Sequence, residues 1–586
     1  MALTVILVVV YGALLAVVSR LTAHCADNDT FFSGGRRSPW WAVAFGMLGA
    51  SLSGVTFVSV PGMVRATDMT YLQMCLGFIP GYLAVAFLLL PVYYRLGLTS
   101  IYTYLDRRFG LTAYYTGASF FLLSKLLGAA VRLYLVCLIL QRLVFDALGL
   151  PFWLSAVLIL MLIWLYTHRG GIGTIVWTDC LQTAVLLVAL VLIIAALLRA
   201  EGWGIGEAVR QVRDSSMSRI FEFSDWQSRL YFWKQFLSGA FIVVVMTGLD
   251  QDMMQKNLTC RTIRASQKNM IVNGLLYVPV NLLFLSLGVL MYLFATYRAI
   301  ALPASGDEVL PQLCAGGWLG QGALAFFTLG IAAAALSSAD SALTALTTST
   351  VCDLFQRPRD ERLRRRVHIA MSLLLLALII AFRALNSTSV IDAVYVIASY
   401  TYGPLLGLFA FGLFAPARLC PVPRAIPVIC LAAPVLCYLL SLLSATLWHY
   451  HFGYELLLLN GALTALGLWL SCPRTHDAQM KKLPKVYLIR KHPGGRAFLA
   501  ICLFGVVFSV RPLSAVELNH ERIHAAQQRE LLYMPFFILY VVEWLVLWVK
   551  YGDRMKAYEH ICFEKEAYRH QGDMYYLSRR KHYHYR

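Results

Sequence analysis

The chain has 586 residues, of which 59% are hydrophobic and 14% charged, and its mean hydropathy is +0.65. Soluble domains are about 45–50% apolar and about 25% charged, so this composition excludes an ordinary cytoplasmic enzyme and a disordered chain. The 13 cysteines are scattered without a C-x-x-C pair, which excludes a disulfide scaffold, and the net charge of +19 fits basic residues that flank membrane spans.

Apolar stretches before residue 472 are long enough to cross a bilayer, since a membrane helix needs roughly 20 mostly apolar residues. Lys and Arg concentrate in the connections that follow the odd-numbered stretches, with the densest run at 357–366. This bias predicts an amino terminus outside and residue 472 inside, in a domain that covers 1–472. The predicted spans lie near 2–18, 40–62, 71–94, 115–141, 151–167, 174–198, 231–249, 271–296, 318–350, 367–382, 390–414, 426–446 and 453–471.

Two of these spans are interrupted by small residues. The span 40–62 contains G-A-S-L-S-G at 49–54, and the span 231–249 runs into T-G-L-D-Q at 247–251. They are five spans apart, which fits two inverted five-helix repeats whose broken first helices hold substrate and ion. Small residues also permit close helix packing in any membrane protein, and this alternative stays open.

The segment 331–355 carries hydroxyl side chains along one flank at helical spacing, with Asp340 among them. A carboxylate at this depth costs a few kcal/mol or more unless it is paired, protonated or bound to a cation. Na⁺ is a hard cation that prefers oxygen ligands. Hydroxyls can instead bond back to the carbonyl four residues earlier, which explains single hydroxyls but not a row of them around an acid.

Four segments of the chain carry a recognisable pattern: GASLSGVTFVSVPG (49–62), GGIGTIVWTDCLQ (170–182), TGLDQDMMQKNLTCRTIRASQK (247–268) and AAAALSSADSALTALTTSTVCDLF (332–355). A fifth segment, YGPLLGLFAFGLF (402–414), matches more weakly. Together they resemble the sodium:solute symporter family, whose members carry sugars, proline, pantothenate and sialic acid. The resemblance implies an all-α polytopic fold with a ten-helix inverted-repeat core of the leucine-transporter type, one helix before it and two after.

The resemblance also implies where Na⁺ binds, between the first and eighth core helices. The ligands carried over to this chain are the carbonyls of Gly49, Leu52 and Ala334 and the hydroxyls of Ser337 and Ser338.

For a second cation, the resemblance implies Asp179, Ser337, Asp340 and Ser341. Asp340 stands where the sodium–sialate carrier has Ser, and two carboxylates at one small site repel unless a cation or proton lies between them. We therefore favour a second coupling cation, or a proton, over a single-ion cycle. The alternative is that Asp340 pairs with a buried base such as Arg132 or Lys125.

The solute is harder to predict. Where the galactose carrier of the family has Tyr, Asn and Lys, this chain has Met246, Val243 and Tyr277, which argues against the same sugar contacts. Sugar, amino acid, carboxylate and vitamin all stay open. The residues expected to line the substrate site are Thr56, Phe57, Gln73, Val243, Met246 and Tyr277.

Residues 473–586 form a basic carboxyl-terminal domain, with 19 Lys and Arg against 10 Asp and Glu. Its H-E-R-I-H motif puts His520 and His524 on one helix face, where they can hold Zn²⁺, with Glu521 as general base. This motif and a later F-E-K-E-A-Y resemble small HExxH proteins of the zinc-metallopeptidase type. The third ligand is expected to be Glu566, then Glu564, with His560 and Glu543 less favoured.

The stretch 531–549 is long enough to cross the bilayer. If it crosses, His520 and Glu566 end on opposite sides and cannot share a metal; if it lies in the interface, they can. The stretch 498–510 is too short to span and is expected to be a strand or a re-entrant piece. We expect a small α-rich domain that is cytoplasmic or membrane-associated.

The sequence predicts Na⁺-coupled symport of a small organic solute by alternating access, in a bacterial-type inner membrane, with a zinc-binding tail. The alternative is a membrane-embedded zinc hydrolase that uses the transporter-like part as sensor or scaffold. The tail's His and Glu could also form ordinary pairs in an accessory domain. We expect Na⁺, the solute and lipid as partners, and Zn²⁺ as a cofactor of the carboxyl-terminal domain, with no nucleic acid and no required oligomer.

Overall fold

The computed structural model describes residues 2–22, 38–97, 100–385, 390–416, 419–448, 450, 452–472, 486–489, 499–531, 533–573, 576–580 and 585. The chain divides into two compact units, Met1–Cys472 and Pro473–Arg586.

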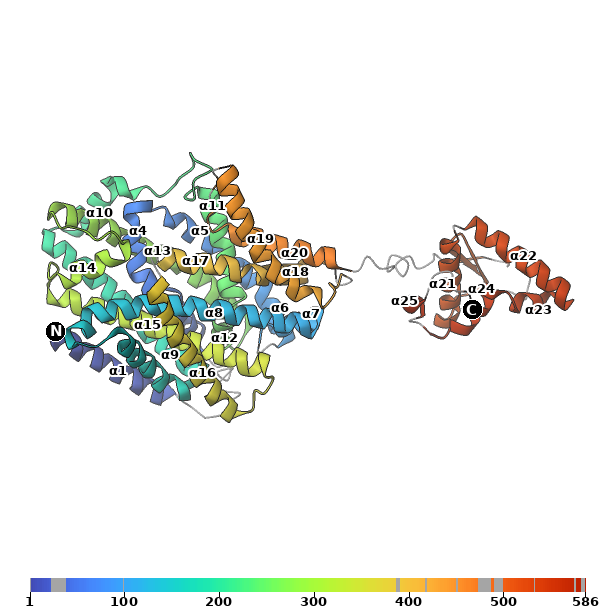
Figure 1. The fold of residues 1–586 in the computed structure, drawn as a ribbon, viewed down its shortest axis with the longest axis horizontal. Helices are drawn as coiled ribbons and strands as arrows, with labels where there is room; N and C mark the ends of the chain where they lie inside the picture. Colours follow the sequence, from blue (N-terminus) through green and yellow to red (C-terminus); the bar gives the residue numbers. More distant parts are fainter. Residues whose placement is uncertain are drawn as a thin grey trace. The chain divides into compact units, whose positions relative to one another are not determined.

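The first unit is helical (Figure 1). The predicted spans fall on helices or bent pairs of helices, but the two spans predicted at 151–167 and 174–198 lie on one continuous helix, α9. The helices α8 and α15 run side by side through its middle (Figure 1). Its helices are α1 (Ala2–Thr22), α3 (Trp40–Ser51), α4 (Gly54–Thr67), α5 (Tyr71–Ala84), α6 (Leu90–Leu96), α7 (Thr103–Phe109), α8 (Leu111–Leu140), α9 (Phe152–Glu201), α10 (Ile205–Asp214), α11 (Phe232–Val243), α12 (Gln251–Asn257), α13 (Ile263–Tyr297), α14 (Val309–Ala315), α15 (Gly320–Ser349), α16 (Glu361–Leu385), α17 (Val390–Thr401), α18 (Gly403–Phe414), α19 (Ala425–Leu447) and α20 (Leu456–Ser471).

Within the described residues of the first unit, seven helices are long and apolar enough to cross a membrane, or up to ten if each bent pair is one span; the helix Met534–Tyr551 of the second unit passes the same test. The outer helix α19 exposes Leu431, Val435 and Leu439 although it is almost wholly apolar. A helix satisfies its own backbone hydrogen bonds, so it can face lipid with such side chains. The first unit is therefore a multi-pass membrane domain.

Three bent pairs interrupt the described helices. The bends are 56° between α3 and α4, 70° between the helix that ends at Gly248 and α12, and 45° between α17 and α18. The first two confirm the breaks predicted from the small residues. The third was missed, although Pro404 at the start of α18 is a signal for it, because proline disfavours a helical residue before it.

The first break is held by close contacts that only glycine allows. A Cβ added to Gly49 would lie 1.8 Å from Thr183 Oγ1 on α9, and one added to Gly54 would lie 2.6 Å from Val136 Cγ2 on α8. Both distances are far below van der Waals contact, so any larger residue would push the broken helix away from its neighbours.

The second unit combines a small sheet with helices. Its strands are ordered β1-β3-β2, with β1 parallel and β2 antiparallel to β3. The turn between β2 and β3 is Phe504-Gly505, and both residues have positive φ, as two-residue hairpins require. Its elements are β1 (Val486–Leu488), β2 (Ala500–Leu503), β3 (Val506–Ser509), α21 (Ala515–Glu530), α22 (Met534–Tyr551), α23 (Arg554–Glu559), α24 (Cys562–His570) and α25 (Tyr576–Arg579).

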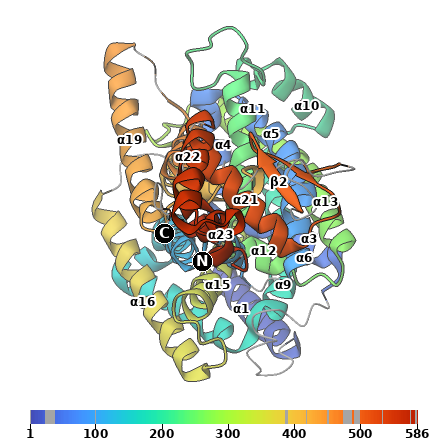
Figure 2. The same ribbon diagram turned by 90° about the vertical axis from the view of Figure 1, so that its right-hand side faces the viewer.

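The hairpin confirms the strand expected within 498–510, and α21 packs beside β2 (Figure 2). Gln528 of α21 donates from Nε2 to the Cys502 carbonyl over 2.7 Å. At its start, α21 has a capping box in which the Ser514 hydroxyl accepts from the Glu517 amide and the Glu517 carboxylate accepts from the Ser514 amide. Such a box fixes where a helix begins. Here it fixes the start of the helix that carries the H-E-x-x-H motif.

The chain turns back after α22. The Cys562 amide donates to Glu543 Oε1 over 3.0 Å, and Trp544 Nε1 donates to the Arg554 carbonyl over 3.3 Å. Residues 554–562 therefore run back along the second half of α22, and α24 begins beside its middle. In this arrangement, α22 does not carry His520 and the acids of α24 to opposite sides.

Candidate functional site

The first break lies against the middle of α15. A Cβ on Gly54 would be 4.0 Å from both the Ile331 carbonyl oxygen and Ala334 Cβ. Leu52, in the break, is fully buried. Because α3 ends at Ser51, the carbonyls that follow Leu48, including that of Gly49, have no amide of a continuing helix to accept from. These contacts place the start of α4 beside Ala334, an expected ligand of the first Na⁺, at the junction of the break with α15.

The hydroxyls of α15 at this junction differ in their partners. Ser337 Oγ donates to Asp179 Oδ1 over 2.6 Å. The buried Ser338 Oγ has no hydrogen-bond partner within the described part of the chain. A buried polar group left without a partner costs about 1–3 kcal/mol. By contrast, Thr347 bonds back to the Leu343 carbonyl over 2.7 Å, so back-bonding explains some of the hydroxyl row but not Ser338.

The expected second cation site contains a lysine. Lys256 Nζ lies 2.8 Å from Asp179 Oδ2 and 2.6 Å from Ser341 Oγ. Ser341 in turn donates from its amide to Asp340 Oδ1 over 2.5 Å. All four side chains are at most 1% exposed. An ammonium thus lies among the oxygens that we expected to bind a second cation.

The sequence offered Arg132 and Lys125 as bases for Asp340, but the base that contacts the Asp179–Ser341 cluster beside Asp340 is Lys256. Lys125 pairs with Asp250 at 3.2 Å and with Asp252 at 2.7 Å, and Lys256 occupies the Asp179–Ser341 cluster instead. The sequence missed Lys256 because 250–268 looked like a connection. In fact α12 is the buried second half of a broken helix, and its basic side chain points into the protein.

The helix breaks also border a cavity of about 100 Å³. Of the expected substrate residues, Thr56, Val243, Met246 and Tyr277 line it. The polar side chains of Lys125, Arg132, Asp250, Tyr395 and Tyr402 line it as well; of these, only Arg132 and Lys125 entered the sequence argument, and then as partners of Asp340.

Two expected substrate residues lie elsewhere, which corrects the prediction. Phe57 is fully buried and packs against Phe284 and Phe327, with ring centroids 5.6 and 5.7 Å away. Gln73 donates to the Leu230 carbonyl over 2.9 Å and accepts from the Glu222 amide over 3.0 Å. Phe57 is therefore a core residue, and Gln73 anchors the 199–230 connection.

Arg132 faces the central cavity from α8. Its positive charge interacts electrostatically with Asp252. A guanidinium presents a rigid fork of donors that matches a carboxylate. Its place in the cavity therefore suits an anionic ligand.

A larger cavity of about 810 Å³ adjoins Tyr71 and Ile397 and is lined by polar residues such as Arg229 and Asp392. Tyr71 and Tyr395 share a hydrogen bond of 2.8 Å between their hydroxyls. Since Tyr395 lines the central cavity and Tyr71 the larger one, this bond lies between the two spaces.

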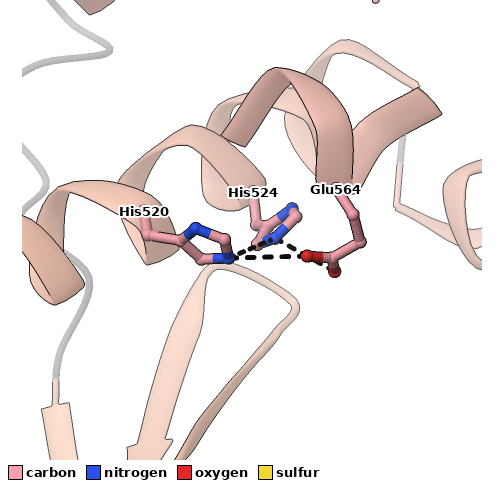
Figure 3. A group of neighbouring side chains, drawn as sticks. All are labelled: His520, His524 and Glu564. Carbon is pink, nitrogen blue, oxygen red and sulfur yellow. Dashed lines mark hydrogen bonds and ion pairs between the residues drawn. The ribbon is translucent and has the colours of Figure 1, made fainter. Parts of the chain in front are cut away.

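In the second unit, His520, His524 and Glu564 converge from α21 and α24 (Figure 3). The two imidazole Nε2 atoms are 3.1 Å apart, and Glu564 oxygens lie 3.5 Å from His520 Nε2 and 3.3 Å from His524 Nε2. Zn–N bonds of about 2.0–2.1 Å in a tetrahedral site give ligand–ligand distances of roughly 3.3 Å. The three side chains thus fit a zinc ion.

The third ligand expected from the sequence, Glu566, is corrected to Glu564. Glu566 Oε1 accepts a hydrogen bond from the Tyr576 hydroxyl over 2.8 Å and pairs with Arg580. Its Oε2 accepts from Gln527 Nε2 over 3.0 Å. Gln527 Oε1 lies 2.8 Å from His524 Nδ1. Glu566 is therefore not a ligand of the triad; it holds the side-chain amide of Gln527, which orients His524.

Electrostatics couple the triad. Burial by itself lowers the pKa of His524, but the nearby Glu564 carboxylate outweighs burial and raises that pKa to about 9. The charged imidazole in turn helps to hold the pKa of Glu564 well below its usual value despite burial. Without metal the pair is imidazolium and carboxylate, and a metal would displace that proton.

A cavity of about 660 Å³ opens beside the triad, and Glu521 lines it together with the three side chains. Its remaining walls are mostly apolar and aromatic, from β2, α22 and α23: Ile501, Cys502, Leu503, Phe536, Phe537, Tyr540, Trp544, Met555 and Tyr558. The expected general base and the expected ligands therefore share one pocket.

Comparisons with known proteins agree with this architecture. The human sodium/iodide cotransporter is 27% identical over 400 residues, 66% of this chain and 61% of that protein. The sodium/sialic acid symporter NanT of Aliivibrio fischeri is 26% identical over 431 residues, 69% of this chain and 81% of that protein. This chain thus spans about three fifths of the human protein's length and four fifths of the bacterial one's.

Two solved structures share the fold. A substrate-bound, outward-open Na⁺-coupled sialic acid symporter superposes with a TM-score of 0.70 at 21% identity, over 81% of this chain and 98% of that one. Mhp1, a nucleobase-cation-symport-1 family transporter, superposes with a TM-score of 0.51 at 15% identity, over 76% of this chain and 96% of that one. The sodium:solute symporter family itself matches residues 31–418, and the chain therefore belongs to the sodium:solute symporter family.

Proposed function

We propose that this chain is a Na⁺-coupled symporter of a small anionic organic solute in a bacterial-type inner membrane. Two observations carry this proposal. The break between α3 and α4 lies against Ile331 and Ala334 of α15, and on the same helix the Ser338 hydroxyl is buried without a hydrogen-bond partner among the described residues. Na⁺ bound there, by the carbonyls of Gly49, Leu52 and Ala334 and the hydroxyls of Ser337 and Ser338, would join the broken helix to α15. Family membership supports the same site.

Arg132 supports the anionic solute. It lines the central cavity, and its guanidinium presents a rigid fork of donors that matches a carboxylate. The relatives named above carry iodide or sialic acid, which are anions at neutral pH. Of the solute classes that the sequence left open, a carboxylate is thus favoured over a neutral sugar.

The transport cycle follows from one ion site beside one solute site. Na⁺ that binds one conformation more tightly shifts the population toward it, and the solute then completes the same conformation. The Tyr71–Tyr395 bond separates the central cavity from the larger one. Breaking and remaking it, as the helices around the fixed site rock, would open the solute site to one side.

A thermal-shift screen tests this function on the purified full chain. We expect a carboxylate to raise the melting temperature in NaCl but not in choline chloride, because ligands that bind only the folded state stabilise it. The amide of the same solute is the matched probe, and Arg132→Gln is the matched variant; both should lose the shift. If the carboxylate and its amide raise the melting temperature equally, the solute need not be an anion. If the carboxylate raises it equally in NaCl and in choline chloride, its binding is not coupled to Na⁺. Either result would refute Na⁺-coupled binding of an anion.

We also propose that the second unit binds Zn²⁺ through His520, His524 and Glu564. The ligand spacing near 3.3 Å supports zinc, and Gln527 holds the His524 ring so that Nε2 faces the other ligands. A bound Zn²⁺ would supply a Lewis acid that lowers the pKa of water. Glu521 in the adjoining pocket is suited to take that water's proton, so a zinc hydrolase that uses the first unit as sensor or scaffold stays the second candidate.

The helix α22 supports membrane association of this unit. Only Phe536 of α22 is buried. Seven exposed aliphatic residues fall within an arc of about 160° at 3.6 residues per turn, and the unit carries an excess of Lys and Arg that suits an anionic leaflet. We propose that this face lies in the lipid interface. The seven are Ile538, Leu539, Val541, Val542, Leu545, Val546 and Val549.

Photolabelling tests this face. The full chain in nanodiscs of phosphatidylethanolamine and phosphatidylglycerol, doped with a diazirine-bearing phosphatidylcholine, should give lipid adducts on peptides from α22, since aliphatic side chains would contact the acyl chains. Adducts should fall severalfold in Val542→Glu/Val546→Glu, and α21 peptides serve as the unlabelled control. Protein–protein adducts on α22 without lipid adducts would mean that another protein surface covers the face.

A further inference from the structure

Several charged side chains are buried around α12. Lys256 is 1% exposed and lies between Asp179 of α9, Asp252 of its own helix and Ser341 of α15. A lysine so deeply buried costs several kcal/mol unless its charge is matched. Its surroundings are those that the family resemblance implies for a second cation.

The geometry of the ammonium is that of a bound cation. Lys256 Nζ has three donors, and it lies 2.8 Å from Asp179 Oδ2, 2.6 Å from Ser341 Oγ and 3.6 Å from Asp252 Oδ1. The first and last of these partners are carboxylates and the other is a hydroxyl. Hard cations take the same oxygen ligands, so the ammonium competes directly with Na⁺ for this space.

The charge balance points the same way. Four carboxylates around α12 are at most 3% exposed, namely those of Asp179, Asp250, Asp252 and Asp340. Lys125 pairs with Asp250 and Asp252, and Lys256 pairs with Asp179. Among the residues that the structure describes, Lys256 thus supplies at Asp179 the positive charge that a second Na⁺ would otherwise supply.

We propose that Lys256 Nζ is a built-in cation that occupies the second cation position, so that this transporter binds one Na⁺ per cycle. This inference rests on the proposed symport function and replaces the two-cation cycle that the sequence favoured. Ser337 links the two positions, since it donates to Asp179 while it belongs to the expected ligands of the first Na⁺. Lys256 is thus a positioning residue that holds Asp179 and Ser341 as a bound ion would.

Equilibrium binding of ²²Na⁺ to the full chain in nanodiscs measures the number of ions directly. We expect one Na⁺ per wild-type chain at saturation. Lys256→Gln should bind two Na⁺ per chain, because the ammonium is removed while the oxygens of Asp179 and Ser341 stay in place. Lys256→Arg, which keeps the charge, should still bind one.

A double variant guards against misfolding of Lys256→Gln. Lys256→Gln/Asp340→Ser removes one charge of each sign, so the buried cluster keeps its net charge, and it too should bind two Na⁺. Two Na⁺ in the wild type, or one Na⁺ in the wild type and in both glutamine variants, would overturn the role of Lys256. No Na⁺ bound by the wild type would instead refute the symport function itself.

Discussion

Ser338→Ala is expected to abolish Na⁺-dependent uptake while the amount of protein in the membrane stays the same. Ser338 Oγ is buried and has no hydrogen-bond partner in the described part of the chain, so its removal costs the folded protein little. It would cost Na⁺ one of about five ligands. A loss of roughly 1.4–3 kcal/mol weakens binding about 10- to 100-fold.

The measurement is the Na⁺ concentration that half-maximally stabilises the purified chain, followed by uptake of the solute found in the screen. Thr348→Ala is the matched control, because Thr348 is another hydroxyl without a partner among the described residues, ten positions farther along the same helix. It should leave the Na⁺ dependence unchanged. Equal Na⁺ affinity in Ser338→Ala and the wild type would remove this hydroxyl from the ion site.

Ser337→Ala should have an additional consequence. Ser337 Oγ donates to Asp179 Oδ1, so the alanine removes both a ligand and a partner of a buried carboxylate. Leaving a buried charged group short of a hydrogen bond costs more than leaving a hydroxyl unpartnered. We therefore expect lost Na⁺ dependence together with reduced thermal stability, whereas Ser338→Ala should lose the Na⁺ dependence alone.

His524→Ala and Glu564→Gln should each remove zinc from the purified full chain. Each deletes one of three protein ligands, and a site left with two holds Zn²⁺ far more weakly. Glu566→Gln should weaken zinc only about 10- to 100-fold, the usual effect of a residue that orients a ligand. The zinc content per chain, measured by mass spectrometry after dialysis against graded chelator, separates the two classes.

His560→Ala is the control, since His560 Nδ1 contacts the Lys556 carbonyl at 2.8 Å and lies outside the triad. Zinc retained in full by Glu564→Gln but lost in Glu566→Gln would restore the ligand set expected from the sequence. A wild-type chain that holds no zinc after purification in zinc-containing buffer would refute the metal site and the hydrolase that depends on it.

Much of this protein follows from local sequence. Apolar stretches of about 20 residues must become helices in lipid, because no other element satisfies its backbone within a single stretch. The small residues at 49–54 and 247–251 likewise predicted two of the bends. The H-E-x-x-H spacing brought His520 and His524 together because residues four apart share a helix face.

Tertiary structure decided which candidates meet. Glu564 and Glu566 are two residues apart, so on a helix their side chains point about 160° away from each other, and only the packing of α24 on α21 selects Glu564. Thr56 and Phe57 differ by about 100° in the same way, and the cavity receives only Thr56.

The role of Lys256 depended on tertiary structure most of all. In sequence it belongs to a basic connection after a span, but the 70° bend brings α12 inside the protein. There its ammonium meets Asp179 and Ser341 from helices far away in the chain. Sequence alone thus determined which segments are apolar enough to enter the membrane and two of the three places where they break, since those depend on neighbouring residues. Which charges pair depends on distances between segments, and only the folded chain sets those.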